Sequence, residues 1–313
     1  MTSTRSTFSL LVTGSNGLLG QKITDLALQD GQIDLIATSR GENRHPVSTG
    51  YRYIDLDILD KQRLREVITQ ERPDVIVNTA AMTHVDVCEQ DPAGCRRLNV
   101  DTVQELVALC EELGIHFIHL STDFIFDGQH GPYAEDDEPN PLSLYGQSKL
   151  DAEHLIRQSS CRWTILRTIL LYGVVADMSR SNIVLWAKGA LEKGQPLNVV
   201  NDQWRMPTLA EDLAQACLLA AAKGAEGVFH ISGEDFFAID ELVAAVADYW
   251  QLDKSLIKQI SSTTLSQAAP RPARTGFHLE KARKILGYAP HSFQEGLAVV
   301  DRQLRAKDVK DKN

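Results

Sequence analysis

The hydrophobic positions of the chain fall into short runs of aliphatic and β-branched residues, separated by longer amphipathic stretches. Short apolar runs of this composition are typical of strands buried on both faces of a parallel sheet. Between them, Asp91 before Pro92 predicts a helix start, and Gly114 after "VALCEEL" predicts a helix end. Thr208 and Glu211 have the spacing of a capping box. The predicted strands are 8–14, 33–40, 74–80, 116–122 and 163–168.

A glycine pattern follows the first predicted strand. In "VTGSNGLLG", Gly14, Gly17 and Gly20 lie where the strand turns into a helix. Glycines in this context allow a tight turn, a close approach of the backbone to a pyrophosphate, and close packing of helix on sheet. The alternative is a glycine-rich turn without a ligand. We favour a dinucleotide site, and therefore an α/β, doubly wound parallel sheet of the Rossmann type.

The alternation of strands and helices changes along the chain. After about residue 168, Pro and Gly are more scattered and helical patterns dominate, which predicts a smaller, mostly helical lobe. We expect a dinucleotide-binding domain over residues 1–168, to which the chain returns at about 198–232. Residues 169–313 are expected to form mainly a substrate lobe.

Composition and charge exclude several other classes of function. The 313 residues are 43% hydrophobic and 24% charged, with a net charge of −10, so no basic surface for nucleic acid or an anionic membrane is expected. The chain shows no signal-peptide core and no apolar run long enough to span a bilayer. Five cysteines without a C-x-x-C pair indicate reduced thiols and a cytoplasmic location. His116 and His119 point to opposite faces of a strand, and we predict no metal.

The end of the second predicted strand bears on the choice of cofactor. An NAD-binding protein usually places a carboxylate about 20 residues beyond the glycine pattern. Here the sequence reads "IATSRG", with Ser39 and Arg40 and no acid. Arg40 could bind the 2′-phosphate of NADPH, or it could be a solvated loop residue. We expect NADPH, with NADH as an option.

Polar side chains at the end of the strand 116–122 are candidates for catalysis. Thr122 belongs to "STD", and Tyr145 and Lys149 of "YGQSK" lie one helical turn apart on the same face. An ammonium near a phenol stabilises the phenolate, so we expect a lowered pKa for Tyr145. With a nicotinamide beside them, these three groups suit hydride transfer to a ketone.

Taken together, the chain resembles the extended short-chain dehydrogenase/reductases, most of all the dTDP-4-dehydrorhamnose reductase group. The matching motifs are "TGSNGLLG", "DLDILD", "NTAAMTHVD", "RRLNVDT", "STDFIFDG", "YGQSK", "NDQWRMPT" and "APRPARTGFHLEKARKILG". The resemblance implies hydride transfer from NADPH or NADH to the 4-keto group of a nucleotide-activated deoxysugar, with Thr122, Tyr145 and Lys149 as catalytic residues. The cofactor residues expected from the motifs are Gly14, Asn16, Gly17, Leu18, Leu19, Gly20, Ser39, Arg40, Asp57, Ile58, Ala80, Ala81, Met82, Asn99, Leu120, Tyr145 and Lys149.

The same resemblance suggests which residues face the substrate. The similar dehydratases have Glu after the aspartate, where this chain has Phe124, so the reductase reaction fits better than water elimination. The rhamnose-forming reductases tend to have tryptophan at Leu170 and a small residue at Arg205. Arg205 could bind a diphosphate or lie on the surface, and Arg271 is the better diphosphate candidate. The predicted substrate residues are Thr122, Asp123, Phe124, Asn182, Arg205 and Arg271.

Two classes of function remain open at this point. The first is an NADPH-dependent reductase of a nucleotide sugar. The second is a non-catalytic regulatory subunit, because a relative of this fold is the partner protein of methionine adenosyltransferase. The expected partner is a small nucleotide-sugar substrate, without nucleic acid or membrane, and a homodimer is left open.

Overall fold

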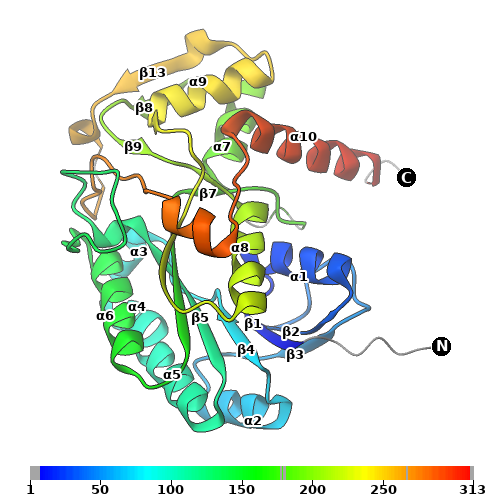
Figure 1. The fold of residues 1–313 in the computed structure, drawn as a ribbon. Coiled ribbons are helices and arrows are strands. Elements are labelled where there is room, and N and C mark those ends of the chain that lie inside the picture. Colours follow the sequence, from blue (N-terminus) through cyan, green and yellow to red (C-terminus); the bar gives the residue numbers. More distant parts are fainter. Residues whose placement is uncertain (1–7, 177, 179–180, 266, 311–313) are drawn as a thin grey trace.

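A computed structural model describes residues 8–310, except 177, 179, 180 and 266, and shows a central sheet of seven parallel strands (Figure 1). The polar leader 1–7 lies outside the described residues. The spatial order is β11-β6-β5-β4-β1-β2-β3, so the direction of winding reverses between β1 and β4. The strands are β1 (Phe8–Thr13), β2 (Ile33–Ser39), β3 (Arg52–Asp55), β4 (Val75–Asn78), β5 (His116–Thr122), β6 (Trp163–Thr168) and β11 (Gly227–Ile231).

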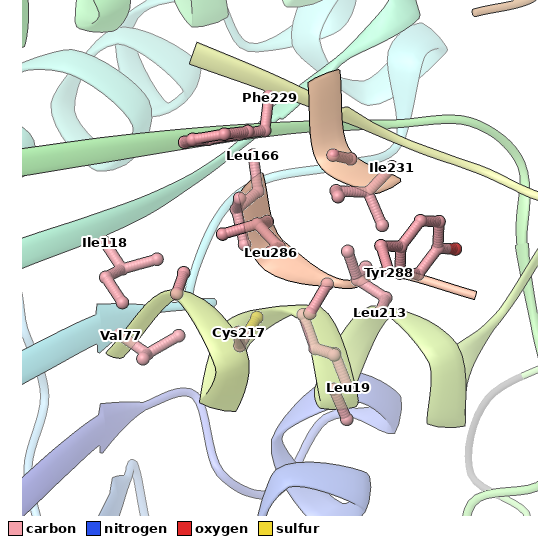
Figure 2. Close-up of a cluster of buried hydrophobic side chains, with 14 of the residues drawn as sticks. Leu19, Val77, Ile118, Leu166, Leu213, Cys217, Phe229, Ile231, Leu286 and Tyr288 are labelled. Atoms are coloured by element: carbon pink, nitrogen blue, oxygen red, sulfur yellow. The ribbon is translucent and has the colours of Figure 1, made fainter. Parts of the chain in front are cut away.

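Helices cover both faces of this sheet. Helices α1 (Leu18–Asp30) and α8 (Ala210–Lys223), with the π-helical turn η5 (Ala282–Leu286), pack on one face, part of which Figure 2 shows. Helices α2 (Lys61–Glu71), α5 (Thr102–Leu113) and α6 (Leu144–Gln158) pack on the other. Because successive strand residues point to opposite faces, Leu10 and Leu11 contribute to different cores. The predicted doubly wound α/β fold is confirmed.

A second, smaller lobe lies at the top of Figure 1, and the chain enters it from the end of β6. Its core packs α7 (Ile183–Glu192), α9 (Ile239–Tyr249) and α10 (Phe293–Lys310) against a pair of short strands, β8 (Leu197–Val200) and β13 (Ile257–Ile260). The other short strands are β7 (Leu171–Tyr172), β9 (Trp204–Arg205), β10 (Thr208–Leu209) and β12 (Phe237–Ala238). Within the described part of the chain, none of the helices combines the length and apolar character needed to cross a membrane.

The predicted helix boundaries are partly right. Asp91 accepts a hydrogen bond from the backbone N–H of Gly94 and starts α4 (Pro92–Arg96). The stretch then passes through a π-helical turn, η1 (Arg97–Asp101), before α5 ends at Gly114. The capping box at Thr208 is wrong. Thr208 lies in β10, and its hydroxyl donates to the backbone carbonyl of Ile169 at 2.6 Å, so α8 begins without a side-chain cap.

Candidate active site

The glycine turn after β1 has the geometry that a dinucleotide site requires. Gly14 has φ +69°, and a Cβ there would lie 3.0 Å from the backbone nitrogen of Ala80. A Cβ on Gly20 would lie 2.5 Å from Cα of Ser15, where α1 crosses the turn. Helix α1 starts at Gly17 without a side-chain cap, so the N–H groups of its first turn are left for a phosphate. These residues therefore fit the diphosphate of a dinucleotide.

The loop after β2 is held beside this turn by Asn16. Its side-chain nitrogen donates to the carbonyl of Glu42 at 2.8 Å, and its oxygen accepts from the backbone N–H of Arg44 at 2.9 Å. The strand ends at Ser39 without an acid, as the sequence predicts. The Arg40 side chain is 80% exposed, and its Nη1 lies 3.9 Å from Oδ2 of Asp57. The predicted cofactor residues Arg40 and Asp57 thus lie close together. Their long ion pair holds the Arg40 side chain only weakly.

The other predicted cofactor residues lie along the carboxyl ends of the central strands. Ile58 and Leu19 are buried in the two sheet cores, and Leu120 packs against the core that contains Leu19. Ala80, Ala81 and Met82, which are half-buried, follow β4. Leu18 is the first residue of α1. Leu18 and residues 80–82 border the point between β1 and β4 where the order of the strands reverses, Leu120 lies in the next strand, β5, and Ile58 follows the edge strand β3.

Asn99 holds the backbone of Met82, another predicted cofactor residue. Its side-chain oxygen accepts from the Met82 N–H at 2.8 Å, and its nitrogen donates to the Met82 carbonyl at 3.0 Å. The same nitrogen also reaches the Ser148 hydroxyl at 3.0 Å. Asn99 lies in the π-helical turn η1, a distortion that often occurs at functional sites. It therefore fixes both a cleft segment and helix α6.

Thr122 and Tyr145 meet at the end of β5. The Thr122 side chain is close enough to the Tyr145 hydroxyl to lower its pKa, and the phenol ring is buried. Helix α6 approaches this strand end closely, because a Cβ on Gly146 would lie 2.2 Å from the carbonyl oxygen of Phe124. Burial raises the pKa of Tyr145, and the Thr122 hydrogen bond acts in the opposite direction. The phenol is therefore held in its protonated, proton-donating form.

The expected action of Lys149 on Tyr145 is not what the structure shows. Both residues face inward from α6, but the Lys149 Nζ atom lies 3.0 Å from Nε2 of His119. Burial lowers the pKa of Lys149 to about 8. The prediction that the ammonium lowers the pKa of Tyr145 is therefore wrong for this arrangement, because desolvation of the phenol dominates and the ammonium is bonded to an imidazole.

Asp123 and Phe124 form the short 3-10 turn η2 (Asp123–Ile125) after the strand. The Asp123 carboxylate is buried and accepts from the hydroxyls of Thr122 and Thr275. Burial raises its pKa, while Arg205 and the two hydroxyls act in the opposite direction. The Phe124 ring stands edge-to-face to Tyr145, with ring centroids 5.8 Å apart. Phe124 thus packs directly on the candidate proton donor.

Arg205 is not a surface residue, so that alternative is wrong. Its side chain is 5% exposed, and Nε lies 3.7 Å from Oδ2 of Asp123. Its two terminal nitrogens donate to the backbone carbonyls of Trp204, Pro272 and Ala273. The guanidinium also lies 5.8 Å from the Phe124 ring centroid. These carbonyls take three of the five N–H groups of the guanidinium, and Nε faces Asp123, so little of the group is left for a diphosphate.

The other two predicted substrate residues also have protein partners. Arg271 forms a two-point ion pair with Asp86 of α3 (Val85–Gln90), with the closest nitrogen and oxygen 2.7 Å apart. The side chains are 17% and 24% exposed. Asn182 caps α7, because its oxygen accepts from the N–H groups of Val184 and Leu185.

Leu170, where the rhamnose-forming reductases tend to have tryptophan, has φ +41°, which is a strained conformation for a residue with a side chain.

Sequence reasoning missed the side chains that connect this site to the sheet. His119 was considered only as a metal ligand, and Asn78, Thr13 and Thr275 were not considered. A signal was present for His119, which is a polar residue inside an apolar strand on the face opposite Ile118. Such a residue needs a partner from the covering helix. Among the described residues, no group of three or more His, Cys, Asp or Glu side chains could hold a metal ion.

The fold and the site together define a Rossmann-type protein of the extended short-chain dehydrogenase/reductase class. The chain belongs to the family described as RmlD substrate binding domain, which it matches over residues 8–305. This finding confirms the resemblance to the dTDP-4-dehydrorhamnose reductase group.

Three relatives show the range of this family. The probable low-salt glycan biosynthesis reductase Agl14 of Haloferax volcanii is 30% identical over 292 residues, which are 93% of this chain and 96% of that protein. Methionine adenosyltransferase 2 subunit beta of Pongo abelii is 32% identical over 276 residues, covering 85% and 79%. A dTDP-4-dehydrorhamnose reductase structure from Clostridium acetobutylicum has a TM-score of 0.83 and 25% identity, covering 95% and 99%.

Proposed function

We propose that this protein is an NADPH-dependent reductase that acts on the 4-keto group of a nucleotide-activated deoxysugar, as its dTDP-4-dehydrorhamnose reductase relative suggests. The observation that carries the proposal is the approach of Thr122, at the end of β5, to Tyr145 of α6, with Lys149 one helical turn further along the same helix. NADPH, when bound, supplies the hydride.

Side chains of the protein protonate and hydrogen-bond the oxygen of the ketone. When the carbonyl carbon gains a hydride, its oxygen takes the electron pair and needs a proton. Tyr145 is protonated because it is buried, and the nearby Thr122 side chain lowers the pKa of the phenol less than burial raises it. Tyr145 therefore donates the proton, while Thr122 turns its hydroxyl hydrogen from Asp123 to the same substrate oxygen. Phe124 forms a wall beside them.

The second candidate is a binding protein without turnover. It is favoured by the 32% identity to methionine adenosyltransferase 2 subunit beta, whose name describes a subunit of another enzyme. The buried Thr122–Tyr145 pair is compatible with either role, because a bound dinucleotide needs no reaction to be held.

The experiment that separates these candidates is NADPH oxidation measured against a panel of nucleotide-linked 4-keto-deoxysugars. A reductase oxidises NADPH with at least one of them, and the product alcohol appears in equal amount. Cofactor binding is measured separately by fluorescence titration. Tight NADPH binding with no turnover on any sugar of the panel would contradict the reductase and favour the binding protein.

A further inference from the structure

A line of hydrogen-bonding side chains crosses the sheet beneath the candidate site. Nζ of Lys149 lies 3.0 Å from Nε2 of His119, and Nδ1 of the same ring lies 3.2 Å from Nδ2 of Asn78. The oxygen of Asn78 accepts from the Thr13 hydroxyl at 2.6 Å. The four residues come from α6, β5, β4 and β1, and all are at least 97% buried. Nothing in the reaction described above uses this line.

The line can accommodate both protonation states of Lys149. A protonated Lys149 donates to Nε2, and the neutral His119 ring then carries its hydrogen on Nδ1. Exchanging the amide oxygen and nitrogen of Asn78 keeps every heavy-atom distance and gives that hydrogen an acceptor. A neutral Lys149 accepts from Nε2–H instead, and Asn78 then donates to Nδ1. In both states each ring nitrogen keeps a partner.

We propose that His119 is a positioning residue for Lys149, and that Asn78 and Thr13 orient its ring. The proposal rests on the proposed function, because the family resemblance makes Lys149 a catalytic residue of that reduction. It also links Lys149 to the glycine turn, since Thr13 immediately precedes Gly14. A histidine that only filled the core would not affect the protonation of Lys149.

Other charged or titratable groups near Lys149 act in known directions. Glu153, one turn further along α6, and Cys95 of α4 raise the pKa of Lys149, but less than burial lowers it. Burial also keeps the pKa of His119 well below its usual value, so the ring is neutral and can accept from an ammonium. Removal of this acceptor should destabilise the charged amine and lower the pKa of Lys149 further.

The first test uses the parent protein without cofactor or substrate. Nitrogen NMR of ¹⁵N-labelled histidine follows the ring of His119, and carbon NMR of ¹³Cε-labelled lysine follows Lys149 as the pH rises from 6 to 10. We expect the two His119 nitrogens to exchange their protonated and unprotonated shifts as Lys149 titrates. His119 nitrogens that do not change with Lys149 would overturn the proposal.

The second test uses His119→Leu and His119→Phe, of which the phenylalanine keeps the ring. Either folded variant should lower the pKa of Lys149 by about one unit, a tenfold change in proton affinity. His116→Leu is the matched control, because this buried histidine of the same strand bonds Thr164 instead. It should leave Lys149 unchanged. An unchanged Lys149 in a folded His119 variant would contradict the proposal.

These measurements remain informative if the proposed reaction is wrong. They need no substrate, so a protein without turnover can still show the coupling of His119 and Lys149. If the reductase function holds, the His119 variants should also shift the pH profile of kcat/KM toward lower pH in step with Lys149. A loss of stability alone, without either shift, would indicate a purely structural histidine.

Discussion

The protonation of Tyr145 is decided by desolvation. The phenol is buried against Phe124, Cys88 and Cys95, so a phenolate would be costly there. A neutral phenol beside the Thr122 hydroxyl is a suitable acid for an oxygen that becomes negative during hydride transfer. At the residue scale, burial therefore favours the neutral phenol over the phenolate, as the proposed reduction requires.

Replacement of Tyr145 by Phe should test this assignment. The ring and its packing stay, while the proton donor is lost, so the rate of NADPH oxidation should fall about 10²–10⁴-fold. This loss corresponds to about 3–5 kcal/mol of barrier. Tyr249→Phe is the control, because Tyr249 packs on Trp250 in the second lobe. A Tyr145→Phe protein within a few-fold of the parent in single-turnover oxidation would exclude Tyr145 as the acid.

Arg40 should decide the preference between the two nicotinamide cofactors. Its exposed side chain has a long contact to Asp57 as its one ion pair with the residues that the structure describes, so it can turn to the 2′-phosphate of NADPH. Arg40→Asp should weaken NADPH about tenfold to a hundredfold more than NADH, since hydrogen bonds to charged groups contribute about 1.5–3 kcal/mol. Fluorescence titration with both cofactors measures this. Arg162→Asp, at the opposite edge of the sheet, makes the same charge change as a control.

At the scale of elements, the position of helix α6 determines the site, because it carries both Tyr145 and Lys149. A buried ion pair holds this helix to the sheet. Glu153 accepts from Nε and Nη2 of Arg167 in β6 at 2.9 and 2.8 Å, and both side chains are fully buried. Such a pair gives α6 one orientation, since a buried charge without its partner is strongly destabilising.

Glu153→Gln keeps the shape of the side chain but leaves Arg167 without its counter-charge. It should lower the free energy of unfolding by about 3–5 kcal/mol, measured by urea denaturation. The control is Glu66→Gln in the exposed pair with Arg63, where the change should stay within about 0.5 kcal/mol. Equal losses in the free energy of unfolding for the two substitutions would show that the buried ion pair does not hold α6 against the sheet.

The same pair predicts a dependence of stability on pH. Burial alone raises the pKa of Glu153, but the hydrogen bonds and charge of Arg167 outweigh it, and the net pKa is lowered. The stabilisation is therefore complete above the ordinary pKa of a glutamate and is lost as the pH falls through the lowered value. Urea denaturation repeated at decreasing pH should show a shallower acid decline for Glu153→Gln than for the parent protein.

The elements themselves could be predicted from the sequence, but their contacts could not. The apolar runs of β1 and β4, and the turn at Gly14, are fixed by residues close together in the chain. Thr208 has the spacing of a helix cap, yet a carbonyl 39 residues earlier takes its hydroxyl. Local spacing cannot show such competition, because the competing acceptor becomes available only when the chain has folded.

At the scale of the whole molecule, one segment ties the second lobe to the cofactor domain. This segment, residues 269–275, contacts Asp86 of α3, Asp123 at the end of β5, and β9. The family resemblance suggested Arg271 as a diphosphate ligand, and Arg205 was a second candidate because it is a cation where the rhamnose-forming reductases tend to have a small residue. The sequence could not show that Arg205 binds the carbonyls of this segment, since those partners lie 67 and 68 residues away.

Arg271 remains the better candidate for contact with the substrate, because its ion pair with Asp86 is partly exposed. A diphosphate that arrives at this segment can compete with Asp86 for the guanidinium. Arg271→Ala should then raise KM with kcat little changed, which is the pattern of lost binding shared by substrate and transition state. Asp86→Asn should have the opposite effect, because it releases Arg271 from its carboxylate and lowers KM.

The two substitutions distinguish an Arg271 that binds the substrate from an Arg271–Asp86 ion pair that only stabilises the structure. If the ion pair of Arg271 and Asp86 only holds segment 269–275 in place, Arg271→Ala and Asp86→Asn remove the same contact. Both variants should then raise KM and lower the free energy of unfolding. Steady-state kinetics with a confirmed sugar substrate, together with urea denaturation of each variant, measures both quantities. Opposite changes in KM support a diphosphate contact at Arg271, and parallel changes contradict it.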